Sequence, residues 1–388
     1  MKSQKISTIN AIMLIISVVI SYITSSLPRT FINETKSATL LNILYNTIIV
    51  LFITLIVCKL FKNFPGFDLL DISKFLGGNV FKNIVGILFI SYFIITSGIM
   101  LRNFCEGLVV VYYPLTNYVF IILMFIIAIF LVNKLSFNAT LNASTIIFPL
   151  VLLSVIFLFF GNFNNFSYNR IFPILGKGFY NTFVLGLKNI SAFGGIGYLY
   201  FLPPILKEPE KFKKIAIISI FLSSSFIFLC VATLLLMFSI FLTLDEIMPL
   251  FSAARHIEFS SFFQRFESIF LLIWIISFCC YLSIVCKFSA HIFNKMFNLS
   301  DIKPILNIFT ILIFGISLIP KNYAVSNLFE TNIYRYLRIT VGFILGLSIL
   351  TLANLKKKKV GDKNYWYFKK NYHCNINYHI CFCLFGFI

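Results

Sequence analysis

The sequence predicts an all-helical polytopic membrane protein with about ten transmembrane helices, arranged as two inverted repeats of five. Three observations predict this fold class. Hydrophobic residues make up 59% of the 388 residues and charged residues only 12%, which excludes a water-soluble domain of this length. The chain holds about ten apolar runs near the length of roughly 20 residues that crosses a bilayer. The first and sixth runs carry helix-breaking residues at corresponding positions of the two halves, as inverted repeats do.

The apolar runs follow one another through short connections. The first run comes after two lysines and is followed by many others, so we expect it to stay as a helix and not to be removed as a signal peptide. The seventh and eighth runs exceed the bilayer requirement, and we expect them to tilt or to extend into the aqueous layer. The runs cover residues 6–28, 39–61, 80–102, 117–133, 141–160, 179–206, 214–243, 263–293, 304–320 and 335–355.

The first run contains a cluster of hydroxyl side chains, Ser21 to Ser26, directly before Pro28. Such a cluster before a proline favours local unwinding of the helix. The sixth run carries Gly194, Gly195 and Gly197 near its centre. Glycine costs roughly 1 kcal/mol relative to alanine inside a helix, so this is where we expect the second interruption.

Unwound backbone in a membrane must find polar partners, and it is tolerated where it packs in protein or lines a cavity. We therefore expect a ligand site at the bilayer midplane between the two broken helices, where the positive end of a half-helix can hold a carboxylate. The alternative is that the small residues of the sixth run only let two helices pack closely. The residues expected to line the site are Ser21, Tyr22, Thr24, Ser25, Thr96, Phe193, Gly194, Gly195, Gly197, Tyr281 and Ser283.

The formal net charge of +19 comes from lysines in short loops, without a basic face carrying interleaved aromatics, so it indicates membrane topology and no nucleic-acid partner. The side richer in Lys and Arg faces the cytoplasm, which places both termini there. That side holds Lys2, Lys5, Lys62, Lys74, Lys82, Lys134, Lys207, Lys211, Lys213, Lys214, Lys295, Lys303 and residues 356–359. The other side holds Arg29, Lys36, Arg102, Arg170, Lys177, Arg255, Arg265, Lys321 and Arg335.

Residues 243–263 lie between the seventh and eighth runs, on the outer side. Thr243 and Glu246 have the spacing of a capping box. Leu250, Phe251, Ala254 and Ile257 fall on one helical stripe. We expect a short amphipathic helix here, either covering the outer mouth or forming an ordinary surface loop helix.

Ionisable residues within apolar runs are costly and often functional. Arg102 and Glu106 are four residues apart and can pair on one helical face. Lys188 either snorkels or faces the cavity. For Lys287 the simpler interpretation is snorkelling, and the alternative is that it neutralises a cation site within the bundle.

The sequence offers no support for an enzyme. Hydrolases and acyltransferases need a nucleophile with a base in reach, yet the histidines before residue 361 are His256 in an outer loop and His291 at a helix end. We expect no catalytic residues, no metal and no cofactor. Residues 1–360 form one membrane domain, and residues 361–388 form a cytoplasmic tail that we expect to be nonfunctional. Its alternative role is zinc binding through His373, Cys374, His379, Cys381 and Cys383.

Three segments carry a resemblance to a known family. They are FQRFESIFLLIW at residues 263–274, NRIFPILGKG at residues 169–178, and residues 102–114 with their acidic Glu106. In this order they resemble the spore germination permeases, the GerAB-type B subunits of nutrient germinant receptors, over residues 5–356. This family is similar to the amino acid, polyamine and organocation transporters. The chain departs from the family pattern in its first helix, where the break from Ser21 to Ser26 contains no glycine.

The resemblance implies a LeuT-like fold and an amino-acid-like ligand at the breaks of helices 1 and 6. It also implies partners, namely a receptor A subunit with its own spans and a C lipoprotein, and a place in the spore inner membrane. Within that scheme, structural or gating roles fall to Arg102, Glu106, Arg265 and Glu267. The competing hypothesis is a secondary amino acid transporter of the vegetative cell membrane, which would share the same site and scaffold.

Overall fold

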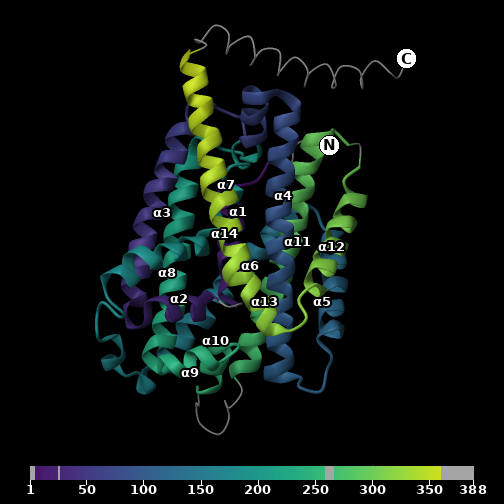
Figure 1. Ribbon diagram of the computed structural model, residues 1–388. Coiled ribbons are helices and arrows are strands. Elements are labelled where there is room, and N and C mark those ends of the chain that lie inside the picture. The colour runs from purple at the N-terminus through teal and green to yellow at the C-terminus, as the bar shows by residue number, and fades with distance from the viewer. Residues whose placement is uncertain (1–4, 25–26, 258–265, 300, 360–388) are drawn as a thin grey trace.

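The computed structural model describes residues 5–24, 27–257, 266–299 and 301–359 (Figure 1). Within these ranges the chain is helical, and its β structure is limited to one isolated bridge between Ile6 and Leu206. The tail that follows residue 359, with its cysteines and histidines, lies outside the described residues.

The first half of the chain holds the interrupted first span and four further spans. Its helices are α1 (Thr8–Thr24), α2 (Leu27–Thr35), η1 (Lys36–Ala38), α3 (Thr39–Phe61), α4 (Leu69–Tyr112), α5 (Tyr118–Asn133) and α6 (Phe137–Gly161). Side-chain caps begin several of them, because the first N–H groups of a helix need acceptors. Asp68 and Asp71 form a capping box at the start of α4, while Asn117 caps α5 and Ser136 caps α6.

The second half begins with an irregular sixth span. The connection before it holds the short helices η2 (Phe163–Asn165) and η3 (Tyr168–Ile171). The span itself consists of η4 (Tyr180–Val184), η5 (Leu185–Phe193), α7 (Ile196–Leu199) and η6 (Pro203–Ile205), and η7 (Pro209–Lys211) follows it. Longer helices follow, namely α8 (Phe212–Met237), α9 (Ile240–Asp245), α10 (Pro249–Arg255), α11 (Phe266–Phe297) and α12 (Lys303–Leu318). The last span comprises α13 (Tyr323–Phe329), η8 (Glu330–Tyr334), α14 (Arg335–Leu337), η9 (Arg338–Leu345) and a helical continuation through residue 359.

These elements provide the expected spans of an integral membrane protein. Six helical stretches are long and apolar enough to cross a membrane, and α1, α5 and α12 are shorter apolar helices. Large apolar side chains such as Ile48 and Phe52 of α3 are exposed on the outside of the bundle. Because lipid tails are themselves apolar, such exposure suits a surface that faces hydrocarbon.

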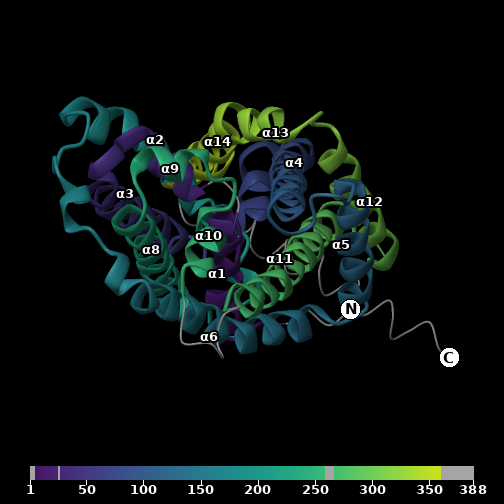
Figure 2. The same cartoon turned by 90° about the horizontal axis from the view of Figure 1, so that it is seen from below.

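Helix α1 forms the centre of the molecule. Its residues from Leu14 to Thr24 are all buried, and Figure 2 shows α6, α8 and α11 around it. Its position is therefore set by neighbouring helices on every side and not by contact with lipid. The candidate site is therefore built around an element that has no lipid-facing side.

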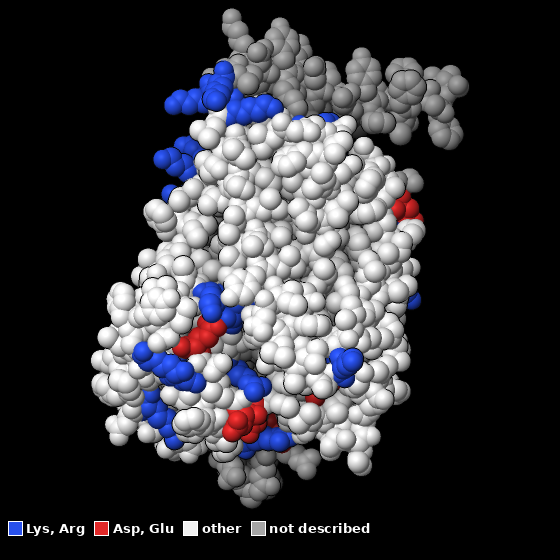
Figure 3. All heavy atoms as spheres, viewed as in Figure 1, with Lys and Arg blue, Asp and Glu red and all other residues white. Residues whose placement is uncertain are grey.

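The two ends of the molecule differ in charge (Figure 3). One end, here called the lysine-rich end, holds Lys295, Lys356 and Lys357. There Lys295 Nζ lies 2.7 Å from Asp68 Oδ2 and 2.6 Å from Asp71 Oδ2, which joins α11 to the start of α4. The opposite end holds α2, α9, α10 and α13 (Figure 1).

The connection between α8 and α11 contains two short helices, α9 and α10, at the opposite end. Leu250, Phe251 and Ala254 on α10, and Ile257 just after it, are buried as the helical stripe predicts. The predicted capping box is wrong. Ser239 caps α9 by accepting a hydrogen bond from the Leu242 N–H, so Thr243 lies inside that helix.

Candidate functional site

The first span is described as α1, which ends at Thr24, and α2, which begins at Leu27. Two of its hydroxyls bond within their own helix: Ser21 Oγ donates to the Ser17 carbonyl at 2.8 Å and Thr24 Oγ1 to the Ser21 carbonyl at 2.7 Å. Such bonds compete with the helical ladder and bend helices. The predicted residue Ser25 lies outside the described residues.

The sixth span is interrupted at its glycines. Gly194 and Gly195 separate η5 from α7, and the Gly194 carbonyl accepts a hydrogen bond of 3.0 Å from Tyr92 Oη on α4. A Cβ added at Gly195 would lie 2.9 Å from Ile15 Cγ2 and 3.0 Å from the Ile15 carbonyl oxygen of α1. The glycines of the sixth span thus allow close packing against α1, as the alternative interpretation expects. This packing occurs where the backbone is not a regular α-helix.

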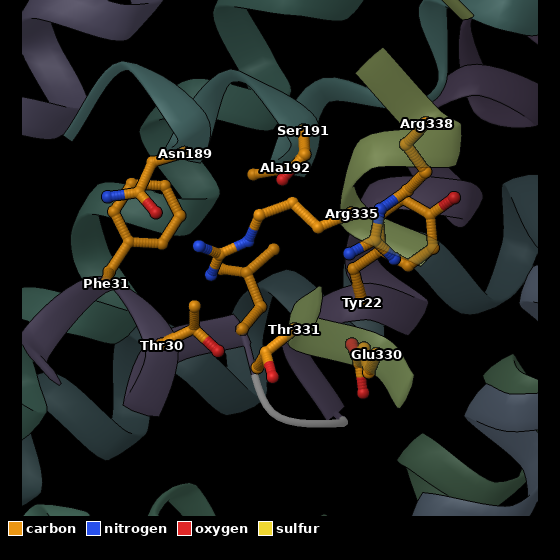
Figure 4. A pocket seen from close by; sticks show the side chains of 11 residues that line it. Tyr22, Thr30, Phe31, Asn189, Ser191, Ala192, Glu330, Thr331, Arg335 and Arg338 are labelled. Atoms are coloured by element: carbon orange, nitrogen blue, oxygen red, sulfur yellow. The ribbon is translucent and has the colours of Figure 1, made fainter. Parts of the chain in front are cut away.

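A pocket lies between the two interrupted spans and the last span (Figure 4). It contains about 310 Å³ of empty space, part of which is open solvent. The first span contributes Tyr22, Leu27, Thr30 and Phe31, the sixth span contributes Asn189, Ser191 and Ala192, and the last span contributes Glu330, Thr331, Arg335 and Arg338. The two broken helices therefore share a cavity, and a third element completes it.

Charged side chains of the last span dominate this pocket. Arg335 forms an ion pair with Glu34 of α2, and Glu330 accepts a hydrogen bond from Asn103 of α4. The guanidinium carbon of Arg338 lies 4.7 Å from the centre of the Tyr22 ring, a cation–π contact. Figure 4 shows Arg335 extending across the pocket and Arg338 beside Tyr22.

The predicted site residues take different places around this pocket. Tyr22 lines it, and Phe193 and Gly194 follow directly after the lining residues Ser191 and Ala192. A Cβ added at Gly197 would lie 2.9 Å from Tyr92 Cε1, so this glycine packs against α4.

Three predicted residues bond to neighbouring helices or to their own backbone. Thr96 Oγ1 donates to the Tyr92 carbonyl at 2.7 Å, and Tyr281 Oη lies 3.5 Å from Met100 Sδ. Ser283 Oγ donates to Asn133 Oδ1 at 2.7 Å, toward α5. These residues are buried in the bundle and do not line the pocket.

The sequence analysis missed the contribution of the last span. It began this span at residue 335 and assigned Arg335 to a loop, whereas the helix begins at Tyr323. Glu330, Arg335 and Arg338 consequently lie inside a membrane helix, and ionisable residues in that position indicate function. The available signal was their spacing, which keeps all three within about two helical turns.

The predicted gating residues fall into two groups. Arg102 Nη2 lies 2.9 Å from Glu106 Oε1, which confirms the predicted pair, and the Arg102 guanidinium also lies 3.6 Å from the centre of the Tyr118 ring. Glu267 lies in the first turn of α11 and is half-buried. Its predicted companion Arg265 lies outside the described residues.

The position of Lys287 differs from the snorkelling interpretation. Its side chain is buried, and Nζ donates to the Val132 carbonyl at 2.9 Å and to Thr140 Oγ1. The lysine thus connects α11 to α5 and α6 within the bundle. Lys188 on η5 is half-buried.

Comparison with known proteins identifies the family. Residues 5–326 match the family model described as "Spore germination protein". The chain belongs to the spore germination permease family. It is 23% identical over 377 residues to the spore germination protein YndE of Bacillus subtilis (strain 168), covering 93% of this chain and 99% of that protein.

A solved structure supports the fold. The permease aligns with a mutant form of the manganese transporter of Eremococcus coleocola with a TM-score of 0.54 and 12% identity, covering 89% of this chain and 76% of that one. This likeness confirms a LeuT-like transporter fold, in which the interrupted first and sixth spans are corresponding elements of two inverted repeats.

Proposed function

We propose that this permease is the membrane subunit of a spore nutrient germinant receptor, located in the spore inner membrane with both termini in the cytoplasm. It binds an amino-acid-like germinant in the pocket between the two interrupted spans. One observation carries the proposal: the two interrupted spans, whose breaks lie at the ligand site in transporters of this fold, border one cavity with charged walls. Of the residues expected from the sequence, Tyr22 lines this cavity.

Ligand binding in such a receptor acts through a conformational equilibrium. The ligand shifts that equilibrium only if it prefers one of the two states. The described connections between spans are short, so a signal that leaves the membrane needs partner proteins. We propose the receptor A subunit and the C lipoprotein as these partners.

The second candidate function is a secondary amino acid transporter of the vegetative cell. The likeness to a transporter fold favours it, since a receptor and a transporter can share both scaffold and site. In that case the ligand would cross the membrane through the same pocket, and no partner subunit would be required for its effect.

Deletion of this chain tests the proposal. Spores without it should fail to germinate with their own nutrient and should still germinate with non-nutrient triggers. Uptake of labelled amino acids by the protein alone, expressed in growing cells, should be absent. If the deleted spores respond normally to every nutrient, or if the protein alone takes up amino acids robustly, the receptor function is wrong and the transporter function is favoured.

A further inference from the structure

We propose that Arg338, on the last span, binds the carboxylate of the ligand in this pocket. The inference rests on the proposed function, because it takes the pocket to be the nutrient site. It adds a side-chain anchor from a third element to a site otherwise built from the two interrupted spans.

Arg338 is buried, and no carboxylate in the described part of the chain pairs with it. Its exposed fraction is 6%, and Nε has no hydrogen-bond partner among the described residues. A buried charge is costly unless it is paired and hydrogen-bonded. Arg338 therefore has capacity for an anion that the described part of the protein does not supply.

The neighbouring charges are already engaged. Arg335 is paired with Glu34, and Glu330 is held by Asn103 from α4. No carboxylate of the described residues forms an ion pair with Arg338. Of the two lining arginines, Arg338 is thus the one that no carboxylate of the described ranges pairs with.

The ring of Tyr22 lies beside the Arg338 guanidinium. A ring face attracts the guanidinium charge and does not replace a strong acceptor for its N–H donors. Arginine presents its donors in a planar fork that fits a carboxylate with two parallel hydrogen bonds. Tyr22 can therefore position Arg338 while its donors bind the ligand.

A guanidinium is a stronger anchor for a carboxylate than the end of a half-helix. A helix N-terminus carries about half an elementary charge, whereas the guanidinium carries a full one. The same pocket also contains the carboxylate of Glu330, so opposite charges line one cavity. The hydrogen bond from Asn103 leaves Glu330 its negative charge, and a carboxylate accepts several hydrogen bonds. This arrangement suits a zwitterion, whose carboxylate lies toward Arg338 and whose ammonium group lies toward Glu330.

The test uses the purified full-length protein in lipid nanodiscs. Each of the twenty proteinogenic amino acids, and propionate, is added singly, and the midpoint of thermal unfolding is measured. Each amino acid that raises this midpoint is then compared with its carboxamide. The variants are Arg338→Gln, Arg338→Lys and the control Arg255→Gln. Arg255 also lies over a tyrosine ring, at 4.9 Å from Tyr112, and donates to the Val111 carbonyl, but it lies outside the pocket.

For the wild type we expect the acid to bind at least tenfold more tightly than its amide. Arg338→Gln should weaken acid binding at least tenfold and leave amide binding within twofold, which removes the discrimination. Arg338→Lys should retain part of the discrimination between acid and amide, because the positive charge remains while the planar pair of guanidinium donors is lost. Arg255→Gln should match the wild type.

Several outcomes would overturn the inference. One is an Arg338→Gln protein that binds the acid as tightly as wild type, and another is a wild type stabilised by none of the probes. If the Arg338→Gln protein does not fold, the Arg338→Lys protein is measured instead. The inference is then wrong if Arg338→Lys binds the acid with wild-type affinity.

Spores separate this inference from the proposed function. If deletion abolishes the nutrient response but Arg338→Gln spores respond at the wild-type nutrient concentration, the receptor stands and the anchor is wrong. If deleted spores respond normally to every nutrient, the receptor is wrong, and the binding measurements alone decide the role of Arg338.

Discussion

A buried tyrosine side chain donates a hydrogen bond to the backbone of the sixth span at its interruption. Tyr92 Oη is fully buried, and it donates to the carbonyl of Gly194 at the centre of the broken sixth span. The same carbonyl accepts from the Gly197 N–H at 3.1 Å, so the tyrosine hydroxyl adds a second hydrogen bond where no water is available. The same tyrosine packs against Gly197, where a side chain would collide with its ring.

Tyr92→Phe should therefore destabilise the protein while keeping its volume. Removal of the hydroxyl takes away one of the two hydrogen bonds to the Gly194 carbonyl, which still accepts from the Gly197 N–H. The loss should cost about 0.5–1.5 kcal/mol, and the midpoint of thermal unfolding should fall. Tyr200→Phe is the matched control, because Tyr200 is equally buried and its Oη has no partner among the described residues. The prediction is wrong if both variants unfold at the same temperature.

Residue chemistry also limits what the sequence could reveal about the site. The glycines of the sixth run and the hydroxyls of the first located both interruptions. However, the number of hydroxyls did not indicate which of them can bind a ligand, because Ser21 and Thr24 donate to carbonyls of their own helix. Partner choice depends on neighbouring helices and on side-chain direction, which a single sequence does not specify.

Among the elements, the hydrophobic runs identified spans better than they identified helix ends. The third run was predicted at residues 80–102, yet α4 covers Leu69–Tyr112. Hydropathy marks the part of a helix that crosses lipid, whereas the capping box of Asp68 and Asp71 marks where the helix begins. The last span was shortened for the same reason, because Glu330 and Arg335 lower its hydropathy, and this hid the third wall of the pocket.

The last span and α2 are joined beside the pocket by the ion pair of Arg335 and Glu34. Arg335 is 4% exposed, so removal of its partner leaves a buried charge uncompensated. Glu34→Gln should lower the free energy of unfolding by roughly 3 kcal/mol or less, since the Glu34 side chain is partly exposed. Thermal or denaturant unfolding in nanodiscs measures this loss.

A double-mutant cycle distinguishes the pair from two unrelated effects. Glu34→Gln combined with Arg335→Gln should recover part of the loss, with a coupling energy of about 1 kcal/mol or more. Glu106→Gln combined with Arg335→Gln is the control, because Glu106 pairs with Arg102, and its effects should add. Additive effects in both cycles would contradict a direct link between α2 and the last span.

At the scale of the whole molecule, the lysine-rich end is closed by several elements at once. The Ile6 N–H donates to the Ile205 carbonyl at 2.8 Å, and the Leu69 N–H donates to the Tyr200 carbonyl at 3.0 Å. Lys295 adds its two contacts to the start of α4. The pocket instead adjoins α2 and the first part of the last span, toward the opposite end (Figure 1). We therefore expect a ligand to enter from the opposite end.

The direction of entry in a cell depends on the orientation of the protein in the membrane, which the loop charges predict. Lysine-rich loops stay in the cytoplasm, so the opposite end and the pocket entrance should face outward. Single cysteines in a cysteine-free background at Lys211 and Lys358, both exposed, should be protected from an impermeant reagent applied to intact cells. A cysteine at Lys177, exposed in the connection before the sixth span, should react. All three should react after permeabilisation, which controls for local accessibility. Reaction at Lys211 without reaction at Lys177 would reverse the orientation, and the pocket would then open toward the cytoplasm, where an external nutrient could not reach it directly.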